Sequence, residues 1–176
     1  SRHIGILIDT KGPEVRTTSC KEPIKYKMGD VVKIFGRPEM ESEHDIVNLS
    51  YVNFADDVHE GDEILFDDGA LSMKVIGING PAVIAQVQND GILGSRKSVN
   101  VPGVHIDLPA LTEKDVQNIN LAIDEDIDFI AHSFVRNASD VKAVQALLDA
   151  RGSNIKIISK IENQEGVDNI DEIIEA

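Results

Sequence analysis

The sequence is poor in several residue types that small proteins often rely on. Its 176 residues include a single cysteine, Cys20, no tryptophan, and 4% aromatic residues. One cysteine excludes a disulfide within the chain and is consistent with a reducing compartment. With so few aromatic rings, isoleucine, valine, leucine and alanine must fill the interior.

Positive charge is also scarce. The chain has 17 Lys and Arg against 31 Asp and Glu, which gives a formal net charge of −14. Binding to nucleic acid or to an anionic membrane requires a basic face, so both roles are disfavoured. A small anionic ligand stays possible, because a few well-placed cations can reverse the potential locally.

Long apolar runs are missing as well. No run approaches the ~20 residues of a membrane span, and the N-terminus has no signal-peptide pattern. Hydrophobic residues at 41% and charged residues at 27% are ordinary globular values, and the length suffices for one medium domain or two small ones. We therefore expect a soluble, cytoplasmic protein.

A short apolar run followed by a charged pair gives the clearest functional signal. Residues 155–158 predict a buried parallel strand, and Lys160 and Glu162 follow where it ends. Residues two apart on a strand point to the same side, so an ammonium and a carboxylate would project together. Parallel α/β sheets place catalytic groups at such strand ends, although a Lys–Glu surface pair of little energetic weight has the same pattern.

Two more apolar runs predict buried strands that end in polar residues. Residues 4–8 are followed by Asp9 and Thr10, and residues 128–134 contain Ser133 near their end. With the third strand and the helical patterns in between, they imply three successive β/α units. Such units have parallel strands joined by right-handed crossovers.

Helical patterns follow or precede each of these strands. Thr112 begins the first helix, with Asp115 in a variant of the capping box. The second helix is expected over residues 137–151 with Ser139 as its cap, and the third from Asn163 to the end of the chain.

Between the first strand and the first helix the pattern is all-β. Short strands separated by Gly, Pro and Asp turns suggest a small barrel or sandwich of about 90 residues. We assign residues 16–107 to this inserted β-domain and residues 1–15 and 108–176 to the α/β domain. The predicted strands of the insert cover residues 31–35, 64–66, 71–76 and 82–87.

The topology predicts where the insert should lie. It leaves from the end of the first strand and returns beside it, so it is expected over the C-terminal face of the sheet. That face holds the active site in β/α folds, and a cleft between insert and sheet is the expected site. Arg16 and Lys97 stand at the two stems of the insert, from which each could reach the cleft.

The candidate site residues fall into two chemical classes. Carboxylates and hydroxyls are hard oxygen ligands, suited to Mg²⁺ or an alkali ion and not to zinc. Cations suit a polyphosphate, and the two classes together point to phosphoryl transfer. The oxygen ligands are Asp9, Thr10, Glu14, Ser133 and Glu162, and the cations are Arg16, Lys97 and Lys160.

In these segments the sequence resembles the pyruvate kinase family. Six motifs stand in the family's order and together cover nearly the whole chain. One such motif alone could arise by chance, but six in sequence do not. They lie at residues 9–16, 66–69, 97–103, 107–110, 133–136 and 158–163.

The resemblance implies a partial TIM (β/α)8 barrel of about three β/α units that carries a small β-barrel lid. It also implies transfer of the phosphoryl group of phosphoenolpyruvate to ADP, which gives pyruvate and ATP in glycolysis. Mg²⁺ and K⁺ would be the cofactors, and the parent enzyme would be a homotetramer. The chain would then be a fragment, without the family's opening strands, its next strand and its C-terminal domain.

The same resemblance implies residue roles at the strand ends. Lys160 would neutralise the phosphoryl group in flight and the developing enolate oxygen. Glu162 would ligate Mg²⁺. Asp9 and Thr10 would hold K⁺, and Glu14 matches the family members that require this ion.

Roles outside these positions are implied for the stems and for the second strand. Arg16 and Lys97 would grip nucleotide phosphates as the insert closes. Ser133, Phe134 and Arg136 would line the site less directly.

Two positions have simpler explanations. Residues 67–69 are expected to form a hairpin turn, with a lid contact by one Asp as the alternative. His132 stands where family members often carry a small residue. It is expected to be a core histidine, and the alternative is that it leans on the site.

Two functions of different classes remain open from the sequence. The chain is either part of a phosphotransferase that is active in its complete form, or a non-catalytic Mg-nucleotide-binding β-barrel module attached to a partial α/β layer. Calorimetry with ADP and Mg²⁺, comparing Arg16→Ala and Lys97→Ala with the unaltered chain, bears on both.

We expect the 176 residues alone to show no pyruvate kinase turnover, because part of the metal and substrate shell would be absent. We also expect self-association, since three β/α units leave apolar faces uncovered. A lactate-dehydrogenase-coupled assay and light scattering measure the two properties. Turnover, or a strict monomer at high concentration, would contradict these expectations.

Overall fold

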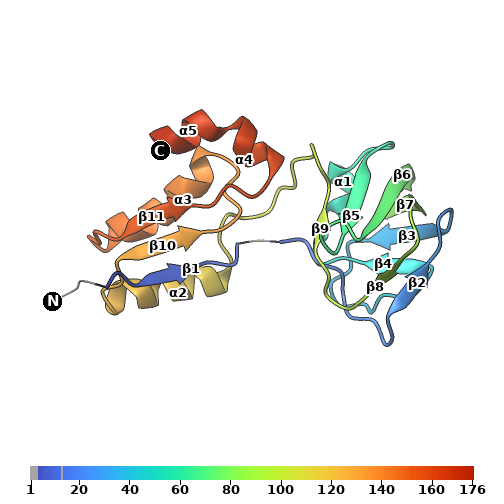
Figure 1. Cartoon of the computed structure of the whole chain (residues 1–176), viewed down its shortest axis with the longest axis horizontal. Helices are drawn as coiled ribbons and strands as arrows, with labels where there is room; N and C mark the ends of the chain where they lie inside the picture. The colour runs from blue at the N-terminus through green and yellow to red at the C-terminus, as the bar shows by residue number, and fades with distance from the viewer. Residues whose placement is uncertain (1–3, 13) are drawn as a thin grey trace. The chain divides into compact units, whose positions relative to one another are not determined.

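The computed structural model describes residues 4–12 and 14–176. The chain divides into two compact units, Ser1–Pro13 with Leu108–Ala176 and Glu14–Asp107. The first boundary therefore falls two residues earlier than the one assigned from sequence. Each unit has its own strands and helices (Figure 1).

The first unit is built on a three-stranded parallel sheet with the strand order β1-β10-β11. Its strands are β1 (Leu7–Asp9), β10 (Phe129–His132) and β11 (Lys156–Ser159). The prediction of parallel neighbours is confirmed. Because all three strands run the same way, their C-terminal ends meet at one edge of the sheet, as the arrowheads in Figure 1 show.

Helices α2 (Glu113–Asp124) and α3 (Ala138–Ala150) connect these strands. The capping box at Thr112 and Asp115 is confirmed, since each side chain accepts a hydrogen bond from the other residue's backbone N–H. The expected cap of α3 is wrong. Asn137 precedes Ser139, has extended backbone, and uses its Oδ1 to accept from the Asp140 N–H at 3.1 Å.

The single C-terminal helix expected from sequence is interrupted. Asn163 caps it as predicted, accepting from the Gly166 N–H at 2.8 Å, but the segment forms α4 (Gln164–Asp168) and α5 (Ile170–Glu175). Asn169 separates the two helices, and its Nδ2 donates to the Arg136 carbonyl at 3.0 Å. The backbone of Asn169 departs from helical dihedral angles, with φ of −100° and ψ of 18°, although its N–H and carbonyl still bond to Glu165 and Ile173.

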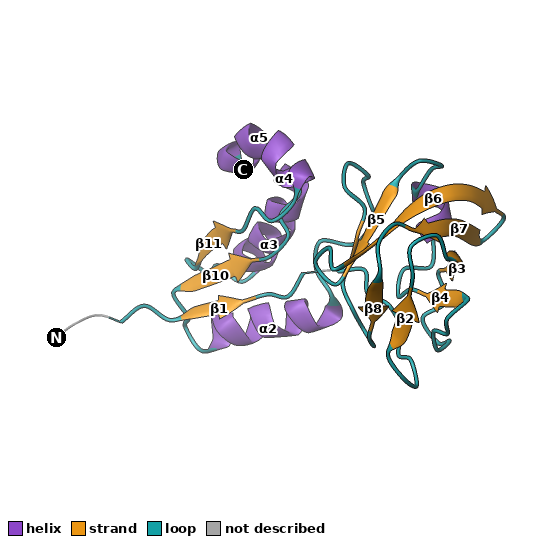
Figure 2. Cartoon of the chain, turned by 45° about the vertical axis from the view of Figure 1, so that its right-hand side comes forward, coloured by secondary structure: helices purple, strands orange, loops and turns teal. Residues whose placement is uncertain are grey.

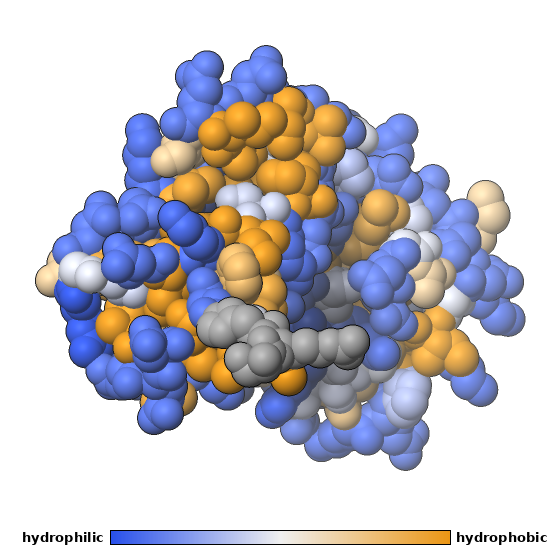
Figure 3. Space-filling view, turned by 60° about the vertical axis from the view of Figure 1, so that its left-hand side comes forward, coloured by the Kyte–Doolittle hydropathy of each residue, from blue (hydrophilic) through white to orange (hydrophobic). Residues whose placement is uncertain are grey.

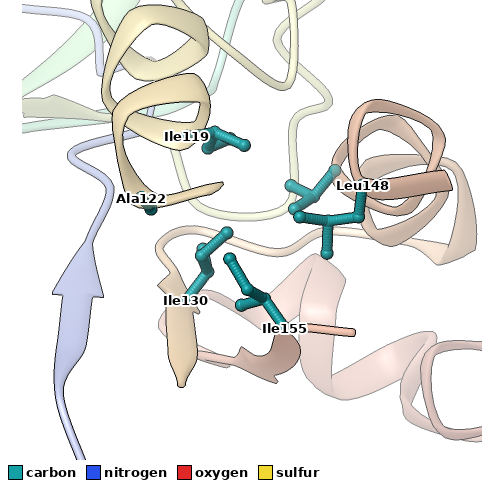
Figure 4. Close-up of a cluster of buried hydrophobic side chains, with 6 residues drawn as sticks. Ile119, Ala122, Ile130, Leu148 and Ile155 are labelled. Atoms are coloured by element: carbon teal, nitrogen blue, oxygen red, sulfur yellow. The ribbon is translucent and has the colours of Figure 1, made fainter. Parts of the chain in front are cut away.

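The core of this unit lies between the sheet and helices α2 and α3 (Figure 4). Ile8, Ile130 and Ile157 are register partners on one sheet face and belong to or pack against this core. Its buried members are Ile119, Ala122, Ile130, Val144, Leu148 and Ile155.

The opposite face of the same sheet is less covered. Leu7 is 48% exposed, Ile158 43% and Phe129 36%. The residues of β1 and β11 are half-buried or exposed, so the prediction of buried strands is wrong for these two outer strands. The uncovered face agrees with the expectation that three β/α units leave apolar surface exposed. Apolar surface is visible as orange patches in Figure 3.

The second unit consists almost entirely of strands and loops (Figure 2). A six-stranded sheet has the order β4-β3-β7-β6-β5-β9, and β2 pairs with β8. This curled sheet fits a β-barrel domain. The elements are β2 (Ile24–Tyr26), β3 (Val31–Phe35), β4 (Ile46–Asn48), α1 (Phe54–Asp57), β5 (Glu63–Phe66), β6 (Leu71–Asn79), β7 (Ala82–Val87), β8 (Gly91–Leu93) and β9 (Val99–Asn100).

The turn between β5 and β6 is a tight hairpin, as predicted. Asp67, Asp68 and Gly69 have φ of 50°, 55° and 89°. Three consecutive left-handed residues are tolerated here because Asp and Gly are the types that adopt this conformation at low cost. The β5–β6 register continues directly to the turn, with Phe66 opposite Leu71.

Within the described residues no helix has both the length and the apolar character that spanning a membrane requires.

Replacing Ile119 with alanine should destabilise the first unit by about 2–5 kcal/mol, because Ile119 is 0% exposed and its loss leaves a cavity. Ile174→Ala, which shortens a side chain that is 76% exposed, is the matched control and should cost far less. Urea unfolding followed by helical circular dichroism reports this unit, because α2–α5 all belong to it. Equal losses in the two variants would contradict the core assignment.

Candidate functional site

Three strand ends of the first unit bring a lysine, a carboxylate and a hydroxyl together. Lys160 follows β11, and its Nζ lies 3.2 Å from Asp9 Oδ2 at the end of β1. The same Nζ donates to Ser133 Oγ, just beyond β10, at 3.0 Å. The sequence prediction named all three residues, and the structure places them at one edge of the sheet.

Lys160 also faces Glu162. The Lys160 Nζ lies 3.7 Å from Glu162 Oε1, so the expected projection of both side chains to one side is observed. The hydrogen bond with Asp9 raises the pKa of Lys160, and the negative charges of Glu162 and Asp9 act in the same direction, against some desolvation. Lys160 is therefore a firmly protonated ammonium between two carboxylates.

The Glu162 carboxylate is held by a backbone group. Its Oε2 accepts a hydrogen bond from the Phe134 N–H at 3.0 Å. Phe134 has a φ of 55°, a left-handed conformation that costs a bulky residue about 1–2 kcal/mol. The surrounding structure imposes this conformation, and its result is an amide aimed at Glu162.

Ser133 is the centre of the hydrogen bonding at this edge. Its Oγ lies 3.0 Å from Asp9 Oδ1 and within hydrogen-bonding distance of the Thr10 carbonyl. A hydroxyl has one proton, so Ser133 donates to one of these acceptors while it accepts from Lys160. The family resemblance implied only an indirect role for Ser133, whereas its central position becomes visible where the three strand ends meet.

The loop after β1 is pinned by buried polar groups. Thr10 is 2% exposed, and its Oγ1 accepts from the Ser133 N–H at 3.2 Å and lies 3.3 Å from His132 Nδ1. The Lys11 N–H donates to Asp115 Oδ1 at 3.2 Å. Asp115, the third helical residue of the α2 capping box, therefore also fixes the loop that carries Thr10.

Close approach explains the glycine in this loop. Gly12 has a φ of +68°, and a Cβ there would lie 3.0 Å from the Ser133 carbonyl oxygen. A larger residue would be strained by its φ and would push the loop away from Ser133.

His132 is a core histidine, as expected, and it also contacts the loop. It is 1% exposed, and burial lowers its pKa, which favours the neutral imidazole. Both ring nitrogens have partners, Thr10 Oγ1 and the Asp140 carbonyl.

Arg16 and Lys97 belong to the second unit. They come from adjacent segments, since Arg16 forms a bridge with Ser98 and the Thr17 N–H donates to the Lys97 carbonyl. Arg16 Nη2 pairs with Glu14 Oε2 at 2.6 Å, and Lys97 Nζ lies 3.5 Å from Asp67 Oδ2. The two side chains are 51% and 40% exposed, so each cation is paired yet reachable.

The cleft expected between insert and sheet stays a prediction, because the structure defines each of the two units separately. The joint action of Arg16 and Lys97 with Lys160 likewise stays a prediction.

The oxygen ligands at the sheet edge fit a hard cation. The Asp9 carboxylate, the Thr10 carbonyl and the Ser133 hydroxyl converge, and oxygen donors of this kind suit K⁺ or Mg²⁺. Across residues 4–12 and 14–176, no three His, Cys, Asp or Glu side chains are grouped to ligate a metal. A cation here would therefore depend on carbonyl and hydroxyl oxygens or on ligands that a substrate supplies.

Comparison with known proteins gives a consistent result. A family model described as pyruvate kinase, barrel domain, matches residues 1–176. The chain belongs to the pyruvate kinase family. A pyruvate kinase from Borreliella burgdorferi is 47% identical over 177 residues, which cover 100% of this chain and 37% of that protein. One from Sporosarcina psychrophila is 46% identical, covering 97% and 30%, and one from Geobacillus stearothermophilus is 45% identical, covering 99% and 30%.

The resemblance seen in the sequence motifs is thereby confirmed. The chain spans 30–37% of the length of these pyruvate kinases. The matched region includes every residue of the sheet edge and of the two stems.

Asp9→Asn should lower the pKa of Lys160, because it removes the hydrogen-bonded carboxylate that raises this pKa most. The raised pKa means that the interaction stabilises the fold below the lysine's ordinary value of 10.5 and is lost as pH rises through the higher folded value. In Asp9→Asn the folded pKa is closer to 10.5, so the stabilisation is smaller and its loss is complete at a lower pH.

Nuclear magnetic resonance of the Lys160 side chain against pH measures this pKa directly. Asp171→Asn, which removes the same charge from an exposed position on α5, is the control and should leave the Lys160 titration in place. An unchanged Lys160 titration in Asp9→Asn would show that Asp9 does not hold the ammonium.

Proposed function

We propose that this chain carries part of the active site of a pyruvate kinase. The reaction would move the phosphoryl group of phosphoenolpyruvate to ADP and give pyruvate and ATP in glycolysis. The observation that carries the proposal is the Lys160 ammonium between Asp9, Ser133 and Glu162 at the C-terminal edge of a parallel sheet. In that proposal the first unit is part of a TIM (β/α)8 barrel and the second is its lid.

Lys160 is the residue proposed to act on the transferred group. Phosphoryl transfer gains most of its rate from positioning and from charge neutralisation. Lys160 offers three N–H donors on a compact positive charge. A lysine is charged in the neutral range, and the hydrogen bond with Asp9 raises the pKa of Lys160 further. Its side chain is 33% exposed, so a substrate can reach it.

The carboxylates are proposed to hold the cations. Glu162 would hold Mg²⁺, and its bond to the Phe134 N–H fixes the carboxylate's direction while Oε1 faces Lys160. Asp9 and Thr10 would hold K⁺, with Ser133 between them. When bound, these ions would supply positive charge next to the phosphoryl and enolate oxygens.

Arg16 and Lys97 are proposed to bind the nucleotide phosphates. Their carboxylate partners are Glu14 and Asp67, and Arg16 Nη1 also donates to the Arg96 carbonyl at 2.8 Å. Exposed ion pairs of this kind contribute little to stability, so a polyphosphate with more negative charge can replace the carboxylates at small cost. The lid would thus exchange internal ion pairs for phosphate contacts.

The alternative function is a non-catalytic Mg-nucleotide-binding β-barrel module. The observation in its favour is that Arg16 and Lys97 both lie in the second unit, which is compact on its own.

A homotetrameric assembly and a cytoplasmic location are also part of the main proposal.

A chimeric enzyme tests the main proposal. This chain would replace the matching segment of the Borreliella burgdorferi pyruvate kinase, and turnover would be followed with the lactate-dehydrogenase-coupled assay. We expect an active chimera in which Lys160→Met lowers kcat by about 10²–10³-fold, because a charge that stabilises the transition state is removed. Lys156→Met, an exposed lysine on β11, is the control and should stay within about twofold.

The same chimera distinguishes the alternative function, a non-catalytic binding module, from the main proposal. Lys25, an exposed residue of β2, provides the control. If ADP with Mg²⁺ binds without turnover, and Arg16→Ala and Lys97→Ala weaken this binding while Lys25→Ala does not, the β-barrel module is supported. A folded chimera in which Lys160→Met and Lys156→Met retain equal activity would contradict the role proposed for Lys160.

A further inference from the structure

His132 is a buried polar residue that the proposed reaction does not use. It is 1% exposed, and its two ring nitrogens contact Thr10 and Asp140. A buried imidazole costs free energy unless its nitrogens are hydrogen-bonded. Both are, and the identities of their partners fix which nitrogen carries the proton.

The Asp140 carbonyl determines the tautomer. His132 Nε2 lies 3.1 Å from this oxygen, which can only accept, so Nε2 must carry the hydrogen. The neutral ring then has an unprotonated Nδ1, which accepts from the Thr10 hydroxyl at 3.3 Å. The hydroxyl proton of Thr10 is thereby committed to His132.

Thr10 is left without rotational freedom as a result. While its Oγ1 donates to His132, it accepts from the Ser133 N–H at 3.2 Å. Its backbone N–H donates to the Ala131 carbonyl at 2.9 Å, and its carbonyl oxygen faces the Ser133 hydroxyl. That hydroxyl in turn contacts Asp9 and Lys160.

The other end of this chain of bonds is anchored just as firmly. Asp140 is 4% exposed, and its carboxylate accepts from the backbone N–H and the guanidinium of Arg136 at 2.9–3.0 Å. Its own N–H is capped by Asn137. The carbonyl that orients His132 therefore belongs to a fixed residue.

We propose that His132 is a positioning residue: its Nδ1 holds the Thr10 hydroxyl so that the Thr10 carbonyl and the Ser133 hydroxyl keep their places beside Asp9 and Lys160. The effect on phosphoryl transfer rests on the function proposed above, whereas the hydrogen-bond arrangement does not. A histidine that merely filled space would need neither a defined tautomer nor an acceptor directed at Thr10.

The first test determines the ring tautomer in the 176-residue chain by ¹⁵N nuclear magnetic resonance. We expect a protonated Nε2 and an unprotonated Nδ1. In Thr10→Val, which keeps the shape but removes the hydroxyl, the Nδ1 resonance should move toward that of an unbonded nitrogen. A protonated Nδ1, or an Nδ1 resonance unaffected by Thr10→Val, would overturn the proposal.

The second test uses two substitutions that each keep one half of the imidazole. An asparagine amide lies near the position of Nδ1 and can still accept from Thr10, whereas a glutamine amide lies near Nε2 and reaches Asp140 instead. Amide hydrogen exchange of Ser133 should be about tenfold faster in His132→Gln and within about threefold of the unaltered chain in His132→Asn. His59→Gln, at a histidine whose side chain is 81% exposed, is the control.

Equal exchange in His132→Asn and His132→Gln would overturn the proposal, because a space-filling role does not distinguish them. If both variants fail to fold, the tautomer and the Thr10→Val measurement still decide. In the active chimera, His132→Gln should raise the K⁺ concentration for half-maximal turnover by about tenfold and change kcat less. In His132→Asn this K⁺ concentration should stay close to that of the unaltered chimera.

The outcomes separate the two proposals. An inactive chimera with the expected exchange pattern overturns the proposed function and leaves the positioning role in place. An active chimera in which the asparagine and glutamine variants show equal amide exchange and equal K⁺ dependence supports the proposed function and overturns the positioning role of His132.

Discussion

The contact of the Lys160 ammonium with Asp9 and Ser133 is the constraint on which the sheet edge depends. It joins residues up to 151 positions apart in sequence. The ammonium separates two carboxylates, those of Asp9 and Glu162, that would otherwise repel each other across the same edge. Parallel strands make the contact possible, because each delivers its last residues to the same place.

Rigid backbone supports this contact at both sides. Phe134 has an unfavourable left-handed conformation, and in this conformation its backbone N–H donates to the Glu162 carboxylate. Gly166, in the first turn of α4, leaves room for the Val135 carbonyl, which would lie 2.5 Å from a Cβ at this position. Strain and close packing of this kind persist where the surrounding structure fixes them, and they are concentrated at functional sites.

The second unit uses charge differently from the first. Around Lys160 the charges form one cluster, whereas Arg16 and Lys97 each pair with a separate carboxylate in an exposed setting. In a chain with a net charge of −14, such local pairing keeps cations in place without creating a basic surface. In the proposed function, a ligand with several phosphate groups would replace these carboxylates as the partner of both cations.

The sequence by itself determined the features that depend on neighbours in the chain. These include the order of strands and helices in the first unit, the caps at Thr112 and Asn163, the hairpin at residues 67–69, and the common direction of Lys160 and Glu162. In the second unit the sequence predicted β3, β5, β6 and β7 but missed the shorter elements β2, β4, α1, β8 and β9. Two local predictions were wrong: the cap of α3 is Asn137 and not Ser139, and the last helix is interrupted at Asn169, whose backbone leaves helical dihedral angles.

Only the tertiary structure decided which residues meet. The central place of Ser133, the amide of Phe134 at Glu162 and the bond between His132 and Thr10 link strands that are far apart in the chain. The exposure of β1 and β11 likewise depends on what covers each sheet face. Local sequence patterns indicate the direction of side chains on a strand and the hydrophobic period of an element. Hydrogen bonds between distant segments form only once the strands have paired. For that reason the sequence could name these residues without assigning their partners.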